Sequence, residues 1–181
     1  MEVTVSALEV EKKELDGVLL IKPSTHFKDF RGEYVETYNE KLYQKAGIDI
    51  HFIQDDISTS KKNVLRGIHG DQKTWKLVTC LYGEFYMVVV NWDPASPQYK
   101  KWTSFVLSDK NRHQVLIPPK FGNGHLVLSE QAVFHYKQST YYDRAGQFTL
   151  RWNDADLNLR WPIQSPILSE RDGGIPTMSS A

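Results

Sequence analysis

The amino-acid sequence predicts an all-β protein, either a sandwich or a barrel. Short runs rich in β-branched and aromatic residues recur through residues 51–152, and turns that contain Gly or Pro separate them. No helical segments alternate with these runs, which argues against a parallel α/β sheet. The five Trp and nine Tyr fit the same class, because aromatic side chains favour strands. At 181 residues the chain is long enough for one well-buried domain and short for two, so we expect residues 1–181 to form a single domain.

The individual elements follow from local patterns. A first strand is expected in residues 17–23, where an apolar run ends at Pro23, and a charged turn in residues 26–36 leads into an alternating strand. The segment from Asn39 to Gly47 has helical composition and ends in Gly, which predicts a short helix. The strands expected after this helix span residues 52–58, 64–71, 77–82, 84–92, 102–107, 114–117, 124–128, 132–139 and 148–152. The C-terminal segment, residues 160–181, is Pro-rich and predicts no long strand.

Composition excludes several classes of partner. The 22 basic residues balance the 22 acidic ones, so the net charge gives no reason to expect nucleic acid or an anionic membrane as a partner. The single cysteine, Cys80, excludes an intrachain disulfide and a Cys-rich zinc site, and its apolar surroundings predict a buried, inert thiol. No stretch is apolar for about 18 residues, and the first residues lack the pattern of a secretion signal. We therefore expect a cytoplasmic protein.

Common catalytic motifs are missing from the sequence. The six His residues include no pair spaced two or four apart, so we expect no metal site. The chain has no Gly-x-Ser-x-Gly motif for an activated serine, and neither the Walker pattern nor Gly-x-Gly-x-x-Gly for a phosphate loop. A nucleotide would therefore have to be bound by side chains.

Residues 64–78 bring together three groups suited to acid–base chemistry and anion binding. Arg66, His69 and Lys76 lie on a stretch that reads as strand, but Arg66 and His69 differ by three and so would face opposite sides. A bulge at Gly67 is one way to direct both into one cavity. A neutral imidazole can accept a proton at cellular pH.

Spacing alone leaves less specific interpretations open for each of these residues. Taken alone, a histidine on a strand is more often a structural residue than a functional one, and this holds for His69. Arg31, Arg66 and Lys76 are suited to neutralise a diphosphate, but they also fit solvated strand positions. Tyr136, in an aromatic strand, is either a proton donor or a half-buried strand residue.

A series of motifs in a fixed order resembles one known family over residues 17–176. The matching segments are Asp29–Glu36, Phe52–Ser58, Val64–His69, Lys76–Val78, Ile117–Gly124, Tyr136, Trp152–Asp154, Trp161–Pro162 and Ser169–Asp172. In this order they resemble the dTDP-4-dehydrorhamnose 3,5-epimerase family. Many motifs in the right order are far more specific than any one of them.

The resemblance implies a fold and a reaction. The fold would be a cupin jelly roll, also called a double-stranded β-helix barrel, with one or two short helices and a central pocket. It would form a homodimer that exchanges N-terminal strands. The reaction would need no cofactor: a proton α to the C4 ketone of a nucleotide-linked sugar is removed, and a proton returns to the opposite face.

The resemblance also assigns roles to four residues. His69 would be the base, and Asp172 the carboxylate that orients its imidazole and supports the positive charge. Lys76 would stabilise the enolate oxygen, as donors in an oxyanion hole do. Tyr136 would be the acid on the other face of the sugar.

The remaining residues carried over from the family would bind substrate. Arg31 and Arg66 would hold the diphosphate, and Gln54 and Glu36 would line the nucleotide or sugar end. Tyr34, beside Arg31 in the charged turn, is placed in the same site.

Departures from the family's usual motifs suggest a larger substrate. Gly70 stands where the family has Tyr and would open volume, Asn123 replaces a His, and Trp75 precedes the lysine. This combination resembles the branch of the family that acts on GDP-linked 4-keto-heptoses in bacterial capsule biosynthesis. Asp55 or Asp56 would then accept hydrogen bonds from a guanine edge.

Several alternatives to this GDP-heptose epimerase remain. The same base and acid would serve a C3-only epimerase, a ketoisomerase or a dTDP-4-dehydrorhamnose 3,5-epimerase. A non-catalytic cupin that binds a nucleotide sugar is less compatible with His69, Lys76, Tyr136 and Asp172 all being present. A metal-dependent cupin is the remaining alternative.

Overall fold

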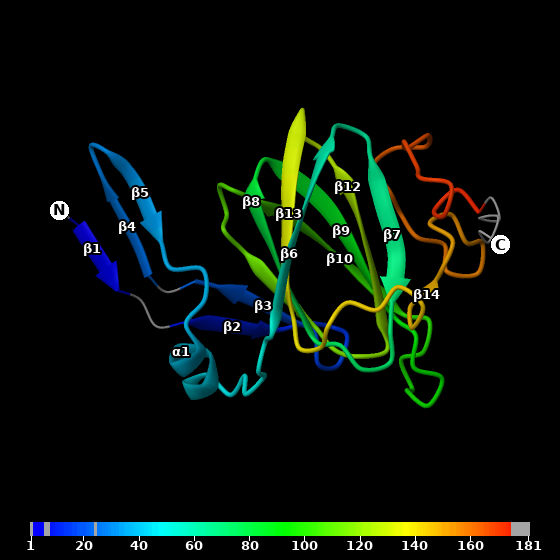
Figure 1. Ribbon diagram of the computed structural model, residues 1–181, viewed down its shortest axis with the longest axis horizontal. Coiled ribbons are helices and arrows are strands. Elements are labelled where there is room, and N and C mark those ends of the chain that lie inside the picture. The colour runs from blue at the N-terminus through cyan, green and yellow to red at the C-terminus, as the bar shows by residue number, and fades with distance from the viewer. Residues whose placement is uncertain (1, 6–7, 24, 175–181) are drawn as a thin grey trace.

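The computed structural model describes residues 2–5, 8–23 and 25–174, and within these ranges the protein consists of antiparallel sheets and one short helix (Figure 1). Every ladder between the strands is antiparallel, and an isolated parallel bridge joins Val64 to Ile167. The predicted all-β class is confirmed. No helix of the described residues is long and apolar enough to cross a membrane.

Two of the sheets build the body of the molecule. The first has the strand order β2 (Glu9–Lys12), β3 (Leu19–Lys22), β11 (Gln114–Ile117), β8 (Lys76–Tyr82), β13 (Gln131–Gln138) and β6 (Gln54–Lys61). The second has the order β10 (Trp102–Ser108), β9 (Glu84–Asn91), β12 (Phe121–Val127), β7 (Leu65–Gly70) and β14 (Phe148–Thr149). Apart from the consecutive pairs β2–β3 and β9–β10, neighbouring strands in each sheet are not consecutive in sequence, as in a jelly roll.

The main core lies between these two sheets. Val78 and Cys80 of β8 meet Phe85 and Met87 of β9 there, and all four side chains are fully buried. The expected burial of the Cys80 thiol is confirmed, and burial, helped by the nearby Asp109 carboxylate, raises its pKa to about 12. A thiol with that pKa is inert at neutral pH.

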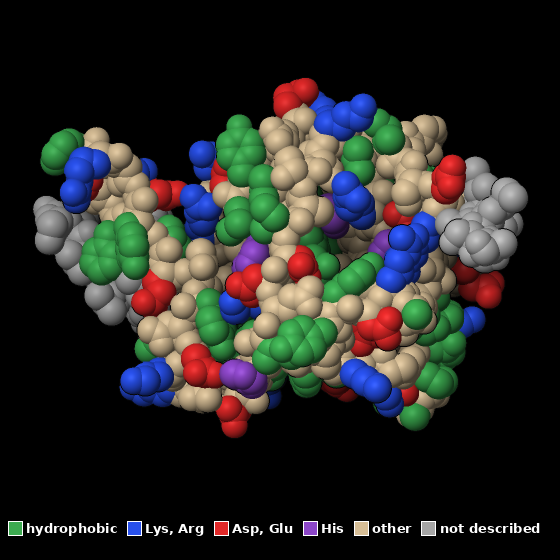
Figure 2. Space-filling view, in the orientation of Figure 1, with side chains coloured by type: hydrophobic (Ala, Val, Ile, Leu, Met, Phe, Trp, Pro, Cys, Tyr) green, Lys and Arg blue, Asp and Glu red, His purple; other side chains and the backbone are tan. Residues whose placement is uncertain are grey.

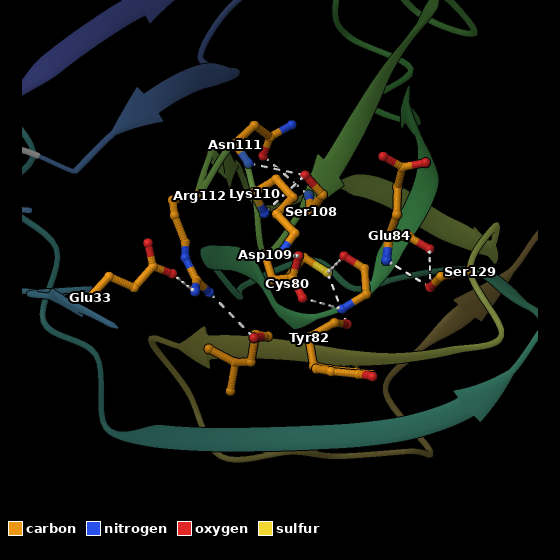
Figure 3. Close-up of polar contacts among 12 residues, drawn as sticks. Glu33, Cys80, Tyr82, Glu84, Ser108, Asp109, Lys110, Asn111, Arg112 and Ser129 are labelled. Atoms are coloured by element: carbon orange, nitrogen blue, oxygen red, sulfur yellow. Dashed lines mark hydrogen bonds and ion pairs between the residues drawn. The ribbon is translucent and has the colours of Figure 1, made fainter. Parts of the chain in front are cut away.

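A third, three-stranded sheet projects from the body at the N-terminal end (Figure 1). It has the order β1 (Glu2–Val5), β4 (Thr25–Asp29) and β5 (Gly32–Val35). Its contact with the body includes an ion pair between Glu33 and Arg112, whose guanidinium also donates to the Leu81 carbonyl at 3.3 Å (Figure 3). Arg112 lies in the turn that follows β10, so this ion pair joins the projecting sheet to the barrel.

The predicted helix is α1 (Glu40–Lys45). Asn39 caps it, since its side-chain oxygen accepts a hydrogen bond from Leu42 N at 3.4 Å, and Gly47 follows with φ +86°. Tyr43 packs with Leu77 on the outer face of the six-stranded sheet.

Most predicted strands are confirmed, with shifted ends. The strand expected at residues 52–58 runs from 54 to 61, and the one expected at 148–152 ends at Thr149. Within residues 160–174 the structure has no strand, and residues 175–181 of the Pro-rich segment lie outside the described part.

Candidate active site

A cavity of about 600 Å³ opens between the two large sheets. Figure 2 shows it as a hollow with histidine side chains inside and basic side chains around it. Its walls come from β6, β7, β8, β12 and β13, and from the loops after β13 and β14. Of the predicted site residues, the lining includes Arg66, His69, Lys76, Asn123, Tyr136 and Asp172.

A bulge in β7 directs Arg66 and His69 into the same cavity. His69 pairs with Asn123 and Arg66 pairs with His125, so three steps along β7 match only two along β12. The extra residue falls beside Gly67, whose φ of +122° only glycine adopts readily. A Cβ at this position would lie 2.5 Å from the Gly124 Cα, so the two strands approach too closely for any other residue. The predicted bulge is confirmed.

The His69 imidazole is paired with the Asp172 carboxylate. Its Nε2 lies 2.6 Å from Asp172 Oδ1, and the Gly67 amide donates to Oδ2 at 3.3 Å. Burial raises the pKa of Asp172, but hydrogen bonds from His69, Gly67 and Ser169 outweigh burial and hold it below its ordinary value. Since a carboxylate only accepts, Nε2 carries the proton and Nδ1 is the basic nitrogen of the neutral ring.

Strand alternation separates Lys76 from Trp75. Lys76 faces the cavity with the inward residues of β8, and its Nζ donates to Asn123 Oδ1 at 3.3 Å. Burial lowers the Lys76 pKa, opposed by the Asp71 carboxylate. Trp75 instead packs with Leu77 in the outer cluster near α1. The structure therefore does not bring Trp75 to the cavity.

Tyr136 faces the cavity from the opposite sheet to His69. It lies on β13, whereas His69 lies on β7, and both side chains line the cavity. Burial first, and then the Asp56 carboxylate and Tyr142, raise the Tyr136 pKa to about 12. The phenol is therefore protonated at neutral pH and can donate a proton.

Three predicted substrate residues lie outside this cavity, on or beside the projecting sheet. Arg31, at the β4–β5 turn, has a 74% exposed side chain and a bidentate contact with Asp29. Tyr34 is 63% exposed and packs against Phe27, with ring centroids 6.0 Å apart. Glu36 follows β5 and does not line the cavity.

Two further predicted residues, Gln54 and Asp56, lie beside the cavity on β6. Asp56 is opposite Tyr136 in the ladder, and its Oδ2 accepts hydrogen bonds from Gln54 at 2.8 Å and from Gln138 at 2.6 Å. The Gln54 side-chain oxygen accepts from the amide of Tyr142, which does line the cavity, at 2.8 Å. The side-chain amides of Gln54 and Gln138 therefore already occupy Oδ2 of the Asp56 carboxylate.

The expectation that Gly70 opens volume in the cavity is wrong. A Cβ on Gly70 would lie 2.3 Å from both the Phe121 carbonyl oxygen and the Phe148 ring. Phe148 pairs with Gly70 in the β14–β7 ladder, so its ring already fills the space that a side chain would take. Gly70 is needed for strand packing and does not line the cavity.

Sequence reasoning missed His125 as a lining residue. It lies two residues after Asn123 on β12, and alternation along a strand puts both on one face. The alternation of side chains along this strand could therefore have predicted from the sequence that His125 lines the cavity.

It also missed groups from the C-terminal loops. Tyr142, Arg144 and Arg171 line the cavity, and the Arg171 guanidinium donates to Thr149 Oγ1 at 2.8 Å and to Gln147 Oε1 at 3.2 Å. Loops have no periodicity from which such placement can be read. With Arg66 and Lys76, these arginines give the cavity a set of basic groups suited to an anionic ligand.

The described residues contain no group of three or more His, Cys, Asp or Glu side chains arranged to hold a metal ion.

Comparisons with known proteins point to one family. A model of the dTDP-4-dehydrorhamnose 3,5-epimerase family matches residues 12–180. The dTDP-4-dehydrorhamnose 3,5-epimerase of Shigella flexneri is 38% identical over 169 residues, covering 91% of this chain and 93% of the relative. The crystal structure of that enzyme from Bacillus anthracis, with TDP and PPi bound, is 32% identical with a TM-score of 0.89, covering 95% of this chain and 100% of the other.

A third relative was solved with a sugar ligand. The dTDP-6-deoxy-D-glucose-3,5-epimerase of Legionella pneumophila, in complex with dTDP-4-keto-L-rhamnose, is 34% identical with a TM-score of 0.87, covering 92% of this chain and 90% of the other. The similarity to these structures confirms the predicted cupin jelly roll. The match extends over nearly the whole chain, and the chain therefore belongs to the dTDP-4-dehydrorhamnose 3,5-epimerase family.

Proposed function

We propose that this epimerase inverts C3 and C5 of a dTDP-linked 4-keto-6-deoxy sugar with its own side chains as base and acid. The observation that carries the proposal is the placement of two proton-transfer groups on opposite walls of one cavity. The His69–Asp172 pair, 2.6 Å apart, lies on one side, and Tyr136 reaches in from the other sheet. Inversion requires a proton to leave one face of the sugar and another to return to the opposite face.

In the proposed reaction, His69 Nδ1 takes the proton from the carbon next to the C4 ketone. The electron pair moves into the carbonyl, and the Lys76 ammonium stabilises the resulting enolate oxygen. The carbon then takes a proton from the Tyr136 hydroxyl on the opposite face, which restores the ketone. Asp172 stays ionised and supports the imidazolium while it exists. The same cycle at the second carbon completes the double inversion, after Tyr136 and His69 exchange protons with solvent.

The relatives favour dTDP over GDP, and a hexose over a heptose. The Shigella and Legionella enzymes are named for dTDP-linked 6-deoxy sugars, and the latter was solved with dTDP-4-keto-L-rhamnose. Two of the departures that suggested a larger substrate lie away from the cavity, because Gly70 is packed against Phe148 and Trp75 faces the outer cluster. Asn123 is the departure that lines the cavity.

We further propose that the site is completed in a homodimer that exchanges N-terminal strands. The projecting sheet carries Arg31, Tyr34 and, at its tip, Phe30, whose side chain is 98% exposed. An aromatic residue with that exposure at the end of a hairpin suits burial against a second copy of the chain. Exchange would carry Arg31 to the diphosphate bound by Arg66 in the other subunit.

Proton exchange in deuterated water tests the reaction. We expect deuterium from D₂O at both C3 and C5 of dTDP-4-keto-6-deoxyglucose, counted by NMR, and slower exchange with freshly oxidised GDP-4-keto-heptose. The variant His69→Asn should lose incorporation at both carbons and keep substrate affinity, because it removes the base and leaves the basic groups of the cavity in place.

Each other outcome identifies an alternative. Unchanged exchange in His69→Asn would remove His69 from the base role, and exchange at C3 alone would make the protein a C3 epimerase. Faster reaction of the GDP-linked heptose would overturn the dTDP assignment. A protein that binds these sugars but exchanges no proton would be a non-catalytic cupin.

A further inference from the structure

His125 occupies an unusual position for a histidine. It lies on β12 in the wall of the cavity, and only 4% of the residue is exposed. Its ring stacks on Phe134 with centroids 4.1 Å apart and an interplanar angle of 9°, and the Phe85 ring lies 5.2 Å away. Two aromatic rings therefore fix the plane of the imidazole at the boundary between core and cavity.

The polar atoms of this imidazole are unsatisfied in the free protein. Among the described residues, neither ring nitrogen of His125 has a hydrogen-bond partner. Buried polar side chains nearly always have a partner, and one that lacks a partner inside a cavity is suited to bind a ligand atom. His125 also lines the cavity, so its side chain borders the space that a ligand would occupy.

The electrostatic surroundings keep the ring neutral. Burial, and after it the electrostatic effects of Arg66 and His69, lower the His125 pKa to about 3, and the Asp172 carboxylate acts in the opposite direction. A neutral imidazole has one N–H donor and one acceptor nitrogen. A sugar hydroxyl also donates and accepts, whereas a phosphate oxygen only accepts, so the ring matches a hydroxyl.

Building on the proposed function, we propose that His125 is a specificity-determining residue that binds a hydroxyl group of the sugar. It acts alongside Arg66, its cross-strand neighbour, which offers the positive charge that an anionic group needs. The paired strands β12 and β7 thus present a neutral group to the sugar next to a charged group suited to the phosphates.

Calorimetry can isolate the sugar contact without requiring turnover. The probes are dTDP and dTDP-glucose, with GDP and GDP-mannose as the second pair, and the readout is the ratio of the two Kd values within each pair. The variant His125→Phe keeps the stacked ring and removes both nitrogens. In this variant we expect the ratio of the nucleotide Kd to the nucleotide-sugar Kd to fall about tenfold, while the Kd of the nucleotide alone is unchanged. His125→Gln, which can still donate and accept, should recover most of the loss.

The matched control is His135→Phe, the same substitution on the outward face of β13, where the side chain does not line the cavity. It should leave both ratios unchanged. Equal loss of nucleotide and nucleotide-sugar affinity in His125→Phe, or no loss of either, would overturn the proposal. Because the readout is binding, a wild-type protein that exchanges no proton would refute the epimerase activity and still allow this contact to be measured.

Discussion

At the scale of single residues, the site depends on the hydrogen bond between His69 and the buried Asp172 carboxylate. Asp172 is 6% exposed and accepts from His69 and from the Gly67 amide, so it is held by both a side chain and the backbone. A buried carboxylate with these partners stays ionised and keeps the proton on His69 Nε2. The reactivity of His69 is therefore determined by a residue far away in the sequence.

We predict that Asp172→Asn lowers kcat by about 10²-fold or more, because a neutral amide cannot support the imidazolium. The measurement is the steady-state rate of deuterium incorporation at saturating substrate. Substrate affinity should change little, since Arg66 and Lys76 remain. An unchanged kcat would show that the carboxylate has no role in proton transfer.

Asp172→Asn should also change how the stability of the fold depends on pH. The Asp172 pKa is lower in the folded protein than its ordinary value of 3.8, so this group stabilises the fold above that pH and the stabilisation is lost as pH falls. The urea midpoint of the wild type should therefore drop more steeply between about pH 5 and pH 3 than that of Asp172→Asn. Parallel curves for the two proteins would contradict this.

At the scale of elements, the bulge in β7 positions two functional groups with one glycine. Without the extra residue, Arg66 and His69 would face opposite sides of the sheet. With it, both line the cavity, opposite His125 and Asn123 of β12. The bulge is therefore a condition for the site as well as a feature of the strand.

We predict that Gly67→Ala destabilises the fold by about 3 kcal/mol, the sum of an unfavourable φ and a steric clash. The new Cβ would lie 2.5 Å from the Gly124 Cα and 2.7 Å from the Asn123 carbonyl oxygen, and neither backbone atom can move aside easily. The control is Gly47→Ala, with φ +86° and no atom within 4 Å, which should cost only about 1 kcal/mol. Urea unfolding measures both, and equal losses would show that the close approach of β7 and β12 is not limiting.

At the scale of the whole molecule, the projecting sheet carries predicted substrate-binding residues that do not line the cavity of their own chain. Arg31 and Tyr34 are exposed, and the ion pair between Glu33 and Arg112 links their sheet to the body. If the sheet completes the site of a second copy, one active site needs residues from two chains.

Mixing two inactive variants tests this arrangement. Arg31→Ala and His69→Asn should each be nearly inactive, and after subunit exchange about a quarter of the sites should be intact, because half of the subunits pair as heterodimers with one complete site each. Sedimentation should show a species of twice the chain mass. Mixing His69→Asn with Asp172→Asn, two residues paired within one chain, should restore nothing, and failure of the first mixture would place Arg31 outside the partner's site.

Much of this protein was predictable from the sequence alone. Alternation and turn residues are local properties, so the all-β class, the helix after Asn39 and most strands could be read directly, and ordered motifs identified the family. Alternation also determines the outward direction of Trp75, because Lys76 beside it faces the cavity.

Other features depended on contacts between residues far apart in the sequence. The tertiary structure alone decided that Phe148 fills the space beside Gly70, that the C-terminal loops bring Arg171 to the cavity, and that His125 lies unpaired in its wall. It also placed Arg31 on a projecting sheet away from its own cavity. Packing and loop paths follow from how the sheets close on each other, and no local pattern contains that information.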